Sequence, residues 1–588
     1  MNEAFGLRSI LQAPRTAYGR IRMLTPSSVW EGIGLGLVAI VAGAAAMLFH
    51  GVTAWIETNT LGRLIHLGRA WFIGGSFGTV LGGSFLASWI IARFAPNVAG
   101  GGVMPVKLAY WRDFGVMHIR TAVVKLIASA LTLGSGVSMG PEGPSIQIGA
   151  ATMSAAAGAA GVAKQSRRAW CAAGAAAGLA AVFNAPLAAI AFIMEEVIGD
   201  LHSKLFGRIV VAAVVGALVA HAVLGPHPAF QAAPLGVITW RPWALVPVVG
   251  LLAALGGAWF QKGSLLIRKR LGAGRPGRFA AYRPVLGAFV SWAAAILVWL
   301  VTDRTGVFGI GYHDVTAAIA GQLSLTAFFL LFVGKTVATT AAVGTSGCGG
   351  IFAPALFIGA MAGGTVAAAF GRFINLGADG ASMLVMVGMA ASLGAVIRTP
   401  MTCILLIYEV TGQWVVIPAI LLATVVSLAV AKSVNTHDMY EEMLEQDGMD
   451  PNQVLPPRHF KRWREIPVSA LATFKPVVIP SLAPAAVREV LAAGRYQRYP
   501  VVDAGGAIRG VLTRHDAELA LSAGQEPPIE GAQWISGKAT VGEARRKMLA
   551  GAADYLLVGD ADENRLEGIL TLHDILRGES VLEEDPAA

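Results

Sequence analysis

One carboxylate stands inside a short glycine- and proline-rich stretch that directly precedes an apolar run. The stretch is Gly140-Pro-Glu-Gly-Pro144, and the carboxylate is Glu142. Unpaired N–H groups and the dipole at the start of a helix favour an anion, and glycine lets the backbone approach it closely. An ionised Glu142 could occupy the anion position and leave it on protonation, so we predict a gate linked to protons. The alternative is a carboxylate that only caps its own helix.

The same stretch recurs in the second half of the chain. Residues 140–150 align without gaps with residues 350–360, and a second block, 174–195, parallels 388–409. The matched pairs include Gly140/Gly350, Pro144/Pro354, Gly149/Gly359, Gly174/Gly388, Pro186/Pro400 and Glu195/Glu409. Repeats interrupted by glycine and proline are typical of transporters whose broken helices meet near the bilayer midplane. Two helix N-termini meeting there could bind an anion without a buried positive charge.

Composition places most of the chain in a membrane. Of its 588 residues, 55% are hydrophobic and 14% are charged. This charged fraction is low for a soluble protein. Apolar runs of spanning length lie at Val29–Leu48, Trp71–Ile91, Ile209–Leu224, Trp243–Phe260, Pro284–Val301, Leu325–Val343 and Val415–Ala431. Four arginines before residue 23 indicate a cytoplasmic start and an uncleaved first span. The net charge of +9 then indicates contact with anionic lipid rather than nucleic acid.

These motifs resemble the CLC chloride channel and transporter family over roughly residues 91–440. Gly140–Pro144 resembles its GREGP signature, Gly349–Pro354 its GxFxP signature, and Gly174–Glu196 its FNAP and EE elements. The resemblance implies a homodimer with one anion pathway per subunit and two inverted repeats. It also implies that Glu142 is the outer gate, that the amides of Ile351 and Phe352 contact the central anion, and that the Glu142 and Gly143 amides lie further out.

The same resemblance assigns proton transfer at the cytoplasmic side to Glu196. Family members that exchange chloride for protons have a glutamate there, whereas channels usually lack it. We therefore favour an exchanger over a channel. The alternative for Glu196 is a structural ion pair, a role that we consider better suited to Glu195, which Glu409 matches in the repeat.

Three positions depart from the family pattern. The GSGIP segment corresponds to Gly101-Gly-Val-Met-Pro105, so Gly102 replaces the anion-contacting serine and a donor worth about 0.5–1.5 kcal/mol is missing. This puts chloride selectivity and tight proton coupling in question. Pro141 replaces the basic residue of GREGP. Tyr440 stands where the family has its anion-contacting tyrosine, although its flanking residues do not match; the alternative is an ordinary interfacial tyrosine.

After Tyr440 the composition changes to that of a soluble α/β module. Two similar units, Arg498–Asp516 and Asp554–Asp574, each contain a glycine, two apolar residues and Thr-x-x-Asp. They resemble tandem CBS domains, in which Thr513, Asp516, Thr571 and Asp574 would contact an adenine nucleotide. Thr and Asp also cap helices, so a purely structural pair is the alternative.

We therefore predict an all-α polytopic membrane protein of two inverted-topology repeats with broken helices, plus a small cytoplasmic α/β CBS pair. The predicted parts are a cytoplasmic segment (1–29), the membrane domain (30–440, with halves at about 30–225 and 240–440), a linker (441–466), CBS modules at 467–524 and 525–580, and a tail (581–588). The predicted function is H⁺/Cl⁻ antiport in the plasma (inner) membrane, with no required cofactor and no enzymatic activity. The alternatives are a passive chloride channel and a CBS-regulated divalent-cation transporter, although the latter needs clustered acidic ligands.

Overall fold

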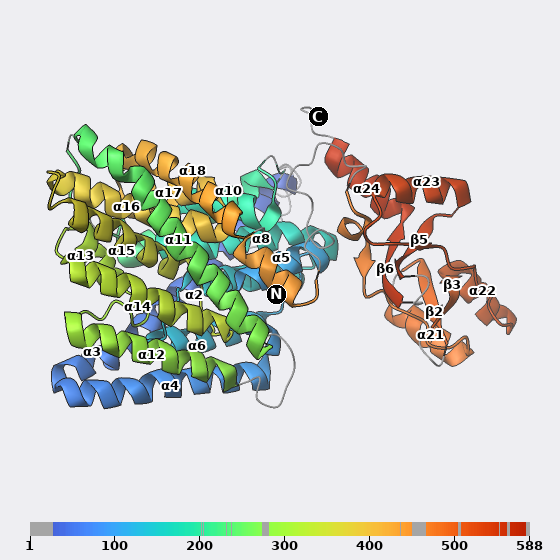
Figure 1. Cartoon of the computed structure of the whole chain (residues 1–588). Coiled ribbons are helices and arrows are strands. Elements are labelled where there is room, and N and C mark those ends of the chain that lie inside the picture. The colour runs from blue at the N-terminus through green and yellow to red at the C-terminus, as the bar shows by residue number, and fades with distance from the viewer. Residues whose placement is uncertain are drawn as a thin grey trace, which may run out of the picture. The chain divides into compact units, whose positions relative to one another are not determined.

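The computed structural model describes two compact units, a helical unit that ends near Asp447 and an α/β unit that follows it (Figure 1). It describes residues 27–583 apart from 202, 204, 231, 237, 273–281, 436, 450–465, 495, 504–506, 552 and 561–564. Most of the predicted N-terminal segment, residues 450–465 of the predicted linker and residues 584–588 of the tail lie outside the described residues. The start of the predicted linker is helical and belongs to the helical unit.

The helical unit is built from helices of very different lengths. In chain order they are α2 (Ser27–Asn59), α3 (Leu61–Leu64), α4 (Arg69–Phe94), α5 (Val103–Arg112), α6 (Ile119–Gly134), α7 (Glu142–Ala159), α8 (Arg167–Phe183), α9 (Pro186–Phe192), α10 (Phe206–Leu224), α11 (Trp240–Leu271), α12 (Arg283–Thr302), α13 (Tyr312–Ile319), α14 (Leu325–Gly344), α15 (Phe352–Phe370), α16 (Gly377–Ile397), α17 (Pro400–Thr411), α18 (Ile417–Val434) and α19 (Met439–Gln446). Short 3₁₀ turns lie at Ile65–Leu67, Pro96–Val98, Lys164–Ser166 and Trp414–Val416, and a π-helical turn at Ile193–Ile198.

Nine helical segments in the described part of the chain are long and apolar enough to cross a membrane. Six of the seven apolar runs noted in the sequence fall within such segments, and the first, Val29–Leu48, begins three residues before its segment, Gly32–Leu67. This confirms a multi-pass membrane protein. The two further segments are α15 and α16, of which 83% and 89% is buried inside the protein. Their apolar side chains therefore form the core of the helical unit rather than its lipid-facing surface.

The two repeated blocks are the helix pairs that pack most closely. In the first half, a Cβ added at Gly149 would lie 2.2 Å from the carbonyl oxygen of Gly174, and one at Gly174 would lie 2.3 Å from that of Gly149. In the second half, Gly359 and Gly388 meet in the same way, at 2.1 Å in both directions. Helices α7 and α8, and likewise α15 and α16, thus touch backbone to backbone, an approach that only glycine permits.

The two halves also cap one another's helices. The Glu195 carboxylate accepts hydrogen bonds from the N–H groups of Met401 and Thr402, at 3.0 and 2.8 Å, at the start of α17. The Glu409 carboxylate accepts from Leu187 and Ala188, at 2.9 and 2.7 Å, at the start of α9. These repeat-related glutamates satisfy unpaired amides of the opposite half. The sequence suggested a structural ion pair for Glu195, whereas these contacts are hydrogen bonds that cap a helix.

The α/β unit contains two small sheets with helices packed against them (Figure 1). Its elements are β1 (Thr473–Phe474), α21 (Pro484–Ala493), β2 (Arg498–Val502), β3 (Ile508–Thr513), α22 (Arg514–Ala523), β4 (Trp534–Ile535), α23 (Val541–Gly551), β5 (Tyr555–Asp560), β6 (Arg565–Thr571) and α24 (Leu572–Glu583), with a 3₁₀ turn at Val468–Ala470. One sheet has the order β1-β6-β5-β4, with β4 parallel to β5 and the other pairs antiparallel. The other is the antiparallel pair β2-β3.

The two predicted modules exchange segments across their boundary. Strand β1 precedes the first module's sheet in the chain but pairs with β6 of the second, with Thr473 opposite Ile569. In return, Glu530 exchanges two backbone hydrogen bonds with Val511 of β3, at 3.0 and 2.8 Å. Each sheet is therefore completed by a segment from the other predicted module, so the two modules form one folded unit.

Candidate functional site

The centre of the helical unit is a contact between the two repeat-related glycines that open the aligned blocks. Gly140 N–H donates to the Gly350 carbonyl at 2.9 Å, and Gly350 N–H donates to the Gly140 carbonyl at 2.6 Å. Equivalent residues that pair with each other in antiparallel fashion define a local two-fold relation between the halves. Helices α7 and α15 each begin two residues after their glycine of this pair, at Glu142 and Phe352. Their N-termini therefore meet in the buried interior of the helical unit.

Glu142 lies at this meeting point and is completely buried. Its Oε1 accepts a hydrogen bond of 2.8 Å from the N–H of Ala353, in the first turn of α15. No described residue provides a partner for its Oε2. A Cβ at Gly140 or Gly350 would lie 2.2 or 2.6 Å from that oxygen, so both glycines are needed to make room for the carboxylate. A carboxylate oxygen thus occupies the amide-lined end of a helix, the position proposed for an anion.

The other residues expected to bind the anion lie around this carboxylate. Ile351 and Phe352 precede and begin α15, and both are buried. The Phe352 ring packs edge-on against Phe192 of α9, with centroids 4.8 Å apart. Gly143 follows Glu142 in the first turn of α7, and a Cβ there would lie 3.4 Å from the Gly350 Cα atom. Glu142, Gly143, Ile351 and Phe352 are therefore brought together by the fold.

The loop before α5 approaches the same place with two glycines that differ in their surroundings. Gly102 has a φ of +104°, which favours glycine, and a Cβ there would lie 2.4 Å from the Gly143 carbonyl oxygen. A Cβ at Gly101 would meet nothing closer than the Gly349 carbonyl oxygen, at 3.6 Å. The backbone thus excludes any side chain at Gly102, the position aligned with the family serine, whereas Gly101 has room for one.

Two buried lysines that sequence reasoning missed hold the loops around the site. Lys125 of α6 donates to the carbonyls of Val98 and Gly100, at 3.1 and 2.5 Å. Lys335 of α14 donates to the carbonyls of Gly306 and Gly309, at 2.9 and 2.7 Å. Both side chains are fully buried. The sequence did contain a sign of this role, because Lys125 and Lys335 each stand 15 residues before the repeat-related glycines Gly140 and Gly350.

Glu196 lies in a buried ion pair. Its Oε1 is 2.6 Å from the Nζ atom of Lys107 on α5, and the side chains are 0% and 5% exposed. Glu196 belongs to the π-helical turn Ile193–Ile198 that continues α9. The contact with Lys107 is the one expected under the alternative interpretation of Glu196, a structural ion pair. The neighbouring Glu195 instead caps helix α17. Lys107 was missed because nothing in the sequence links it to a residue 89 positions away.

Tyr440 is buried near the start of α19, with 4% of its surface exposed. Asp438 caps this helix and accepts from the N–H groups of Tyr440 and Glu441, at 2.8 and 2.9 Å. The Glu441 carboxylate accepts from the Asp438 N–H at 3.4 Å, which completes a capping box. The flanking residues that did not help the sequence match therefore form the cap that positions Tyr440.

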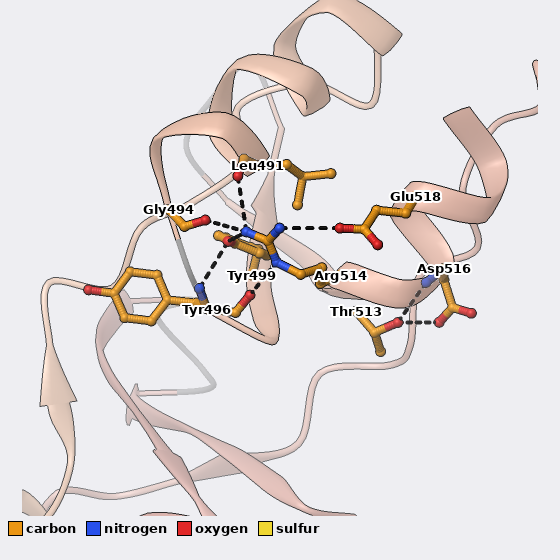
Figure 2. Close-up of polar contacts among 8 residues, drawn as sticks. All are labelled: Leu491, Gly494, Tyr496, Tyr499, Thr513, Arg514, Asp516 and Glu518. Carbon is orange, nitrogen blue, oxygen red and sulfur yellow. Dashed lines mark hydrogen bonds and ion pairs between the residues drawn. The ribbon is translucent and has the colours of Figure 1, made fainter. Parts of the chain in front are cut away.

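In the α/β unit, all four nucleotide candidates belong to helix caps. Thr513 Oγ1 lies 2.5 Å from Asp516 Oδ2 and accepts from the Asp516 N–H at 3.1 Å (Figure 2). The Thr571 hydroxyl and N–H bond to Asp574 Oδ2 at 2.7 and 2.9 Å. These contacts are those of the capping alternative, and they place the four side chains at the starts of the repeat-related helices α22 and α24.

Next to the first cap, the Arg514 side chain connects three segments by hydrogen bonds (Figure 2). Its guanidinium donates to the carbonyls of Leu491 and Tyr496, at 3.0 and 3.1 Å, to the Gly494 carbonyl and to the Tyr499 hydroxyl, and pairs with Glu518 at 3.2 Å. It thereby joins the end of α21, the loop that follows and the start of α22. The second module has Leu572 at the matching position.

The fold and the site together define a polytopic membrane protein of two repeats, in which helix N-termini meet around a buried carboxylate. The model of the voltage gated chloride channel family, or CLC family, matches residues 83–432, and a CBS domain model matches residues 527–580. The family model covers more than half of the chain, so the chain belongs to this family. The resemblance and fold class predicted from the sequence are thereby confirmed.

Curated relatives and solved structures agree with this assignment. The chain is 28% identical over 372 residues to a protein of Vibrio campbellii named H(+)/Cl(-) exchange transporter ClcA, covering 62% of this chain and 77% of the relative. It is 30% identical over 329 residues to a Citrobacter koseri protein named voltage-gated ClC-type chloride channel ClcB, covering 56% and 77%. The fold resembles that of a eukaryotic CLC transporter, with a TM-score of 0.65 and 19% identity over 92% of this chain and 98% of the other. It also resembles that of a slow cyanobacterial Cl⁻/H⁺ antiporter, with a TM-score of 0.63 and 22% identity over 72% and 98%.

Proposed function

We propose that this protein exchanges chloride for protons across a membrane, as a homodimer with one pathway per subunit and with Glu142 as the gate. The observation that carries the proposal is the buried Glu142 carboxylate on the Ala353 N–H. An ionised carboxylate there occupies the place of an anion at the end of α15. Protonation weakens its hold on the amides. Anion entry and proton uptake are then alternatives at one position, which couples the two fluxes.

The remaining site assignments follow from the same geometry. Gly102, Gly143, Ile351, Phe352 and Tyr440 are proposed to line the anion pathway, with backbone amides as the donors. Such neutral donors bind an anion without holding it too tightly for release. Several relatives are named exchange transporters, which supports coupling to protons at Glu142 and Glu196.

A passive chloride channel is the second candidate, and the Lys107–Glu196 ion pair favours it. A glutamate held at 2.6 Å by a buried lysine must break this contact before it can carry a proton, which makes it a poorer proton relay. A divalent-cation transporter has less support. Within the described residues, the single group of three possible metal ligands is His437, Glu442 and Glu445, and these are half-buried or exposed rather than central.

Flux measurements on purified protein in liposomes test the coupling. Glu142→Gln should leave chloride movement measurable and abolish proton movement driven by a chloride gradient, because the amide cannot be titrated. Glu409→Gln is the matched control, since Glu409 also binds helix N-terminal amides, but those of α9 rather than those of α15. Unchanged proton pumping in Glu142→Gln would overturn the gate. Proton coupling that survives in Glu196→Gln would remove Glu196 from the proton route.

We also propose that the α/β unit faces the cytoplasm at the plasma (inner) membrane and binds an adenine nucleotide near Thr513, Asp516, Thr571 and Asp574. The starts of α22 and α24 provide hydroxyl and carboxylate groups suited to phosphate and ribose. Calorimetric titration of the full-length protein with ATP, ADP and AMP tests this. A nucleotide should bind, and Asp516→Ala with Asp574→Ala should weaken it. The absence of binding heat with all three nucleotides would leave capping as the role of these residues.

A further inference from the structure

Gln147 is a buried polar side chain whose hydrogen-bonding groups find no partner in the described part of the chain. It lies in α7 with 0% of its surface exposed. Neither its amide nitrogen nor its amide oxygen has a hydrogen-bond partner among the described residues. Burial of a carboxamide without partners is unfavourable, and native proteins seldom leave both of its polar atoms unpaired. A group from outside the chain is therefore expected to complete its bonding.

The carboxamide lies beside the predicted anion pathway. Gln147 follows Gly143 by four residues, so the two lie on the same face of α7. This face packs on the loop before α5, since a Cβ at Gly102 would lie 2.4 Å from the Gly143 carbonyl and 3.2 Å from the Gln147 amide oxygen. A Cβ at Gly143 would lie 2.0 Å from the Gly101 carbonyl and 3.4 Å from the Cα of Gly350. The starts of α5, α7 and α15 thus come together next to this side chain.

The second repeat shows that the fold does not require a polar residue here. The gapless alignment of residues 140–150 with 350–360 places Phe357 opposite Gln147. Phe357 is fully buried, and its ring packs beneath the Lys335 Nζ atom at 4.8 Å. A Cβ at Gly311, in the loop before α13, would lie 2.9 Å from the same ring. An apolar ring therefore fills the equivalent position of the other half, so packing of this fold does not by itself require the amide of Gln147.

We propose that Gln147 is a specificity-determining ligand that donates an N–H of its carboxamide to the anion as it passes the loop before α5. It provides a side-chain donor where the backbone at Gly102 excludes a hydroxyl. Rotation about the last side-chain bond can present the NH₂ group of the amide to the anion. Because the amide is neutral, it can bind the anion without holding it too tightly for release. The proposal rests on the anion pathway proposed above and adds to it one named side chain.

Donor-free variants test this assignment. Gln147→Leu should weaken chloride binding by roughly tenfold or more, the effect of losing a hydrogen bond to a charged group. It should also change the ratio of chloride to nitrate and fluoride flux, because weakly hydrated anions depend less on a donor. The measurements are chloride calorimetry on the purified protein and liposome fluxes of the three anions. Gln261→Leu is the control, since Gln261 is equally buried but bonds to the His437 carbonyl at 3.0 Å in another part of the unit.

The outcomes separate this inference from the proposed function. If the wild-type protein moves no anion, the proposed pathway fails. If it moves chloride and Gln147→Leu keeps both the affinity and the flux ratios, only the role of Gln147 fails. A purely structural role would lower all three fluxes together, which would also overturn the proposal. Gln147→Met, which keeps the length of the side chain, repeats the test if the leucine variant does not fold.

Discussion

Removal of Lys107 alone should destabilise the helical unit more than removal of its whole ion pair with Glu196. The two charges lie 2.6 Å apart, and their side chains are 5% and 0% exposed. At an effective dielectric constant of 20, their attraction is about 6 kcal/mol. The desolvation of each ion costs several kcal/mol, so the intact pair contributes little net stability. Lys107→Met leaves a buried carboxylate without its partner and should cost about 3–5 kcal/mol.

A double-mutant cycle measures this coupling. The variants are Lys107→Met, Glu196→Gln and the combination, compared by unfolding of the purified protein in detergent. The double variant should be more stable than Lys107→Met, because no charge is then left buried. The control is Arg69→Met, which removes an exposed pair with Asp303 at 3.4 Å and should cost less than about 1 kcal/mol. Losses that simply add in the double variant would show that Lys107 and Glu196 do not interact, and would refute the reasoning.

Three further outcomes are expected. Gly102→Ser should prevent folding, because the serine Cβ would lie 2.4 Å from a backbone carbonyl, whereas Gly101→Ser should be tolerated. Size-exclusion profiles of the two variants test this prediction, and equal yields of folded protein would contradict it. Glu409→Ala should cost about 1–2 kcal/mol in unfolding measurements, since two amides at the start of α9 lose their acceptor. Arg514→Ala should lower the unfolding temperature of the α/β unit, whereas Arg509→Ala, a change at an exposed residue, should not. Equal effects of the two changes would show that the Arg514 contacts in Figure 2 do not stabilise the α/β unit.

Several parts of the site were predictable because they depend on local chemistry. A carboxylate between glycines at a helix start, repeated glycines and matched glutamates are visible in the order of residues. Glu142, Phe352 and a structural role for Glu195 could be inferred for that reason, whereas the helix cap that Glu195 forms was not foreseen. Helices α15 and α16 were found as repeat blocks, but their depth inside the protein was not, since apolar residues that face lipid and those that face the core look alike in sequence.

The sequence by itself determined the membrane class, the repeat, the family and the residues able to meet an anion, because hydrophobic length, glycine spacing and charge are properties of short segments. The tertiary structure decided which of these groups touch. It paired Gly140 with Gly350, set the Glu142 carboxylate against the start of α15, and joined Lys107 to Glu196 across 89 residues. It also left the Gln147 amide without a partner among the described residues. Such contacts depend on where distant backbones approach one another, and packing at glycine contacts sets that approach.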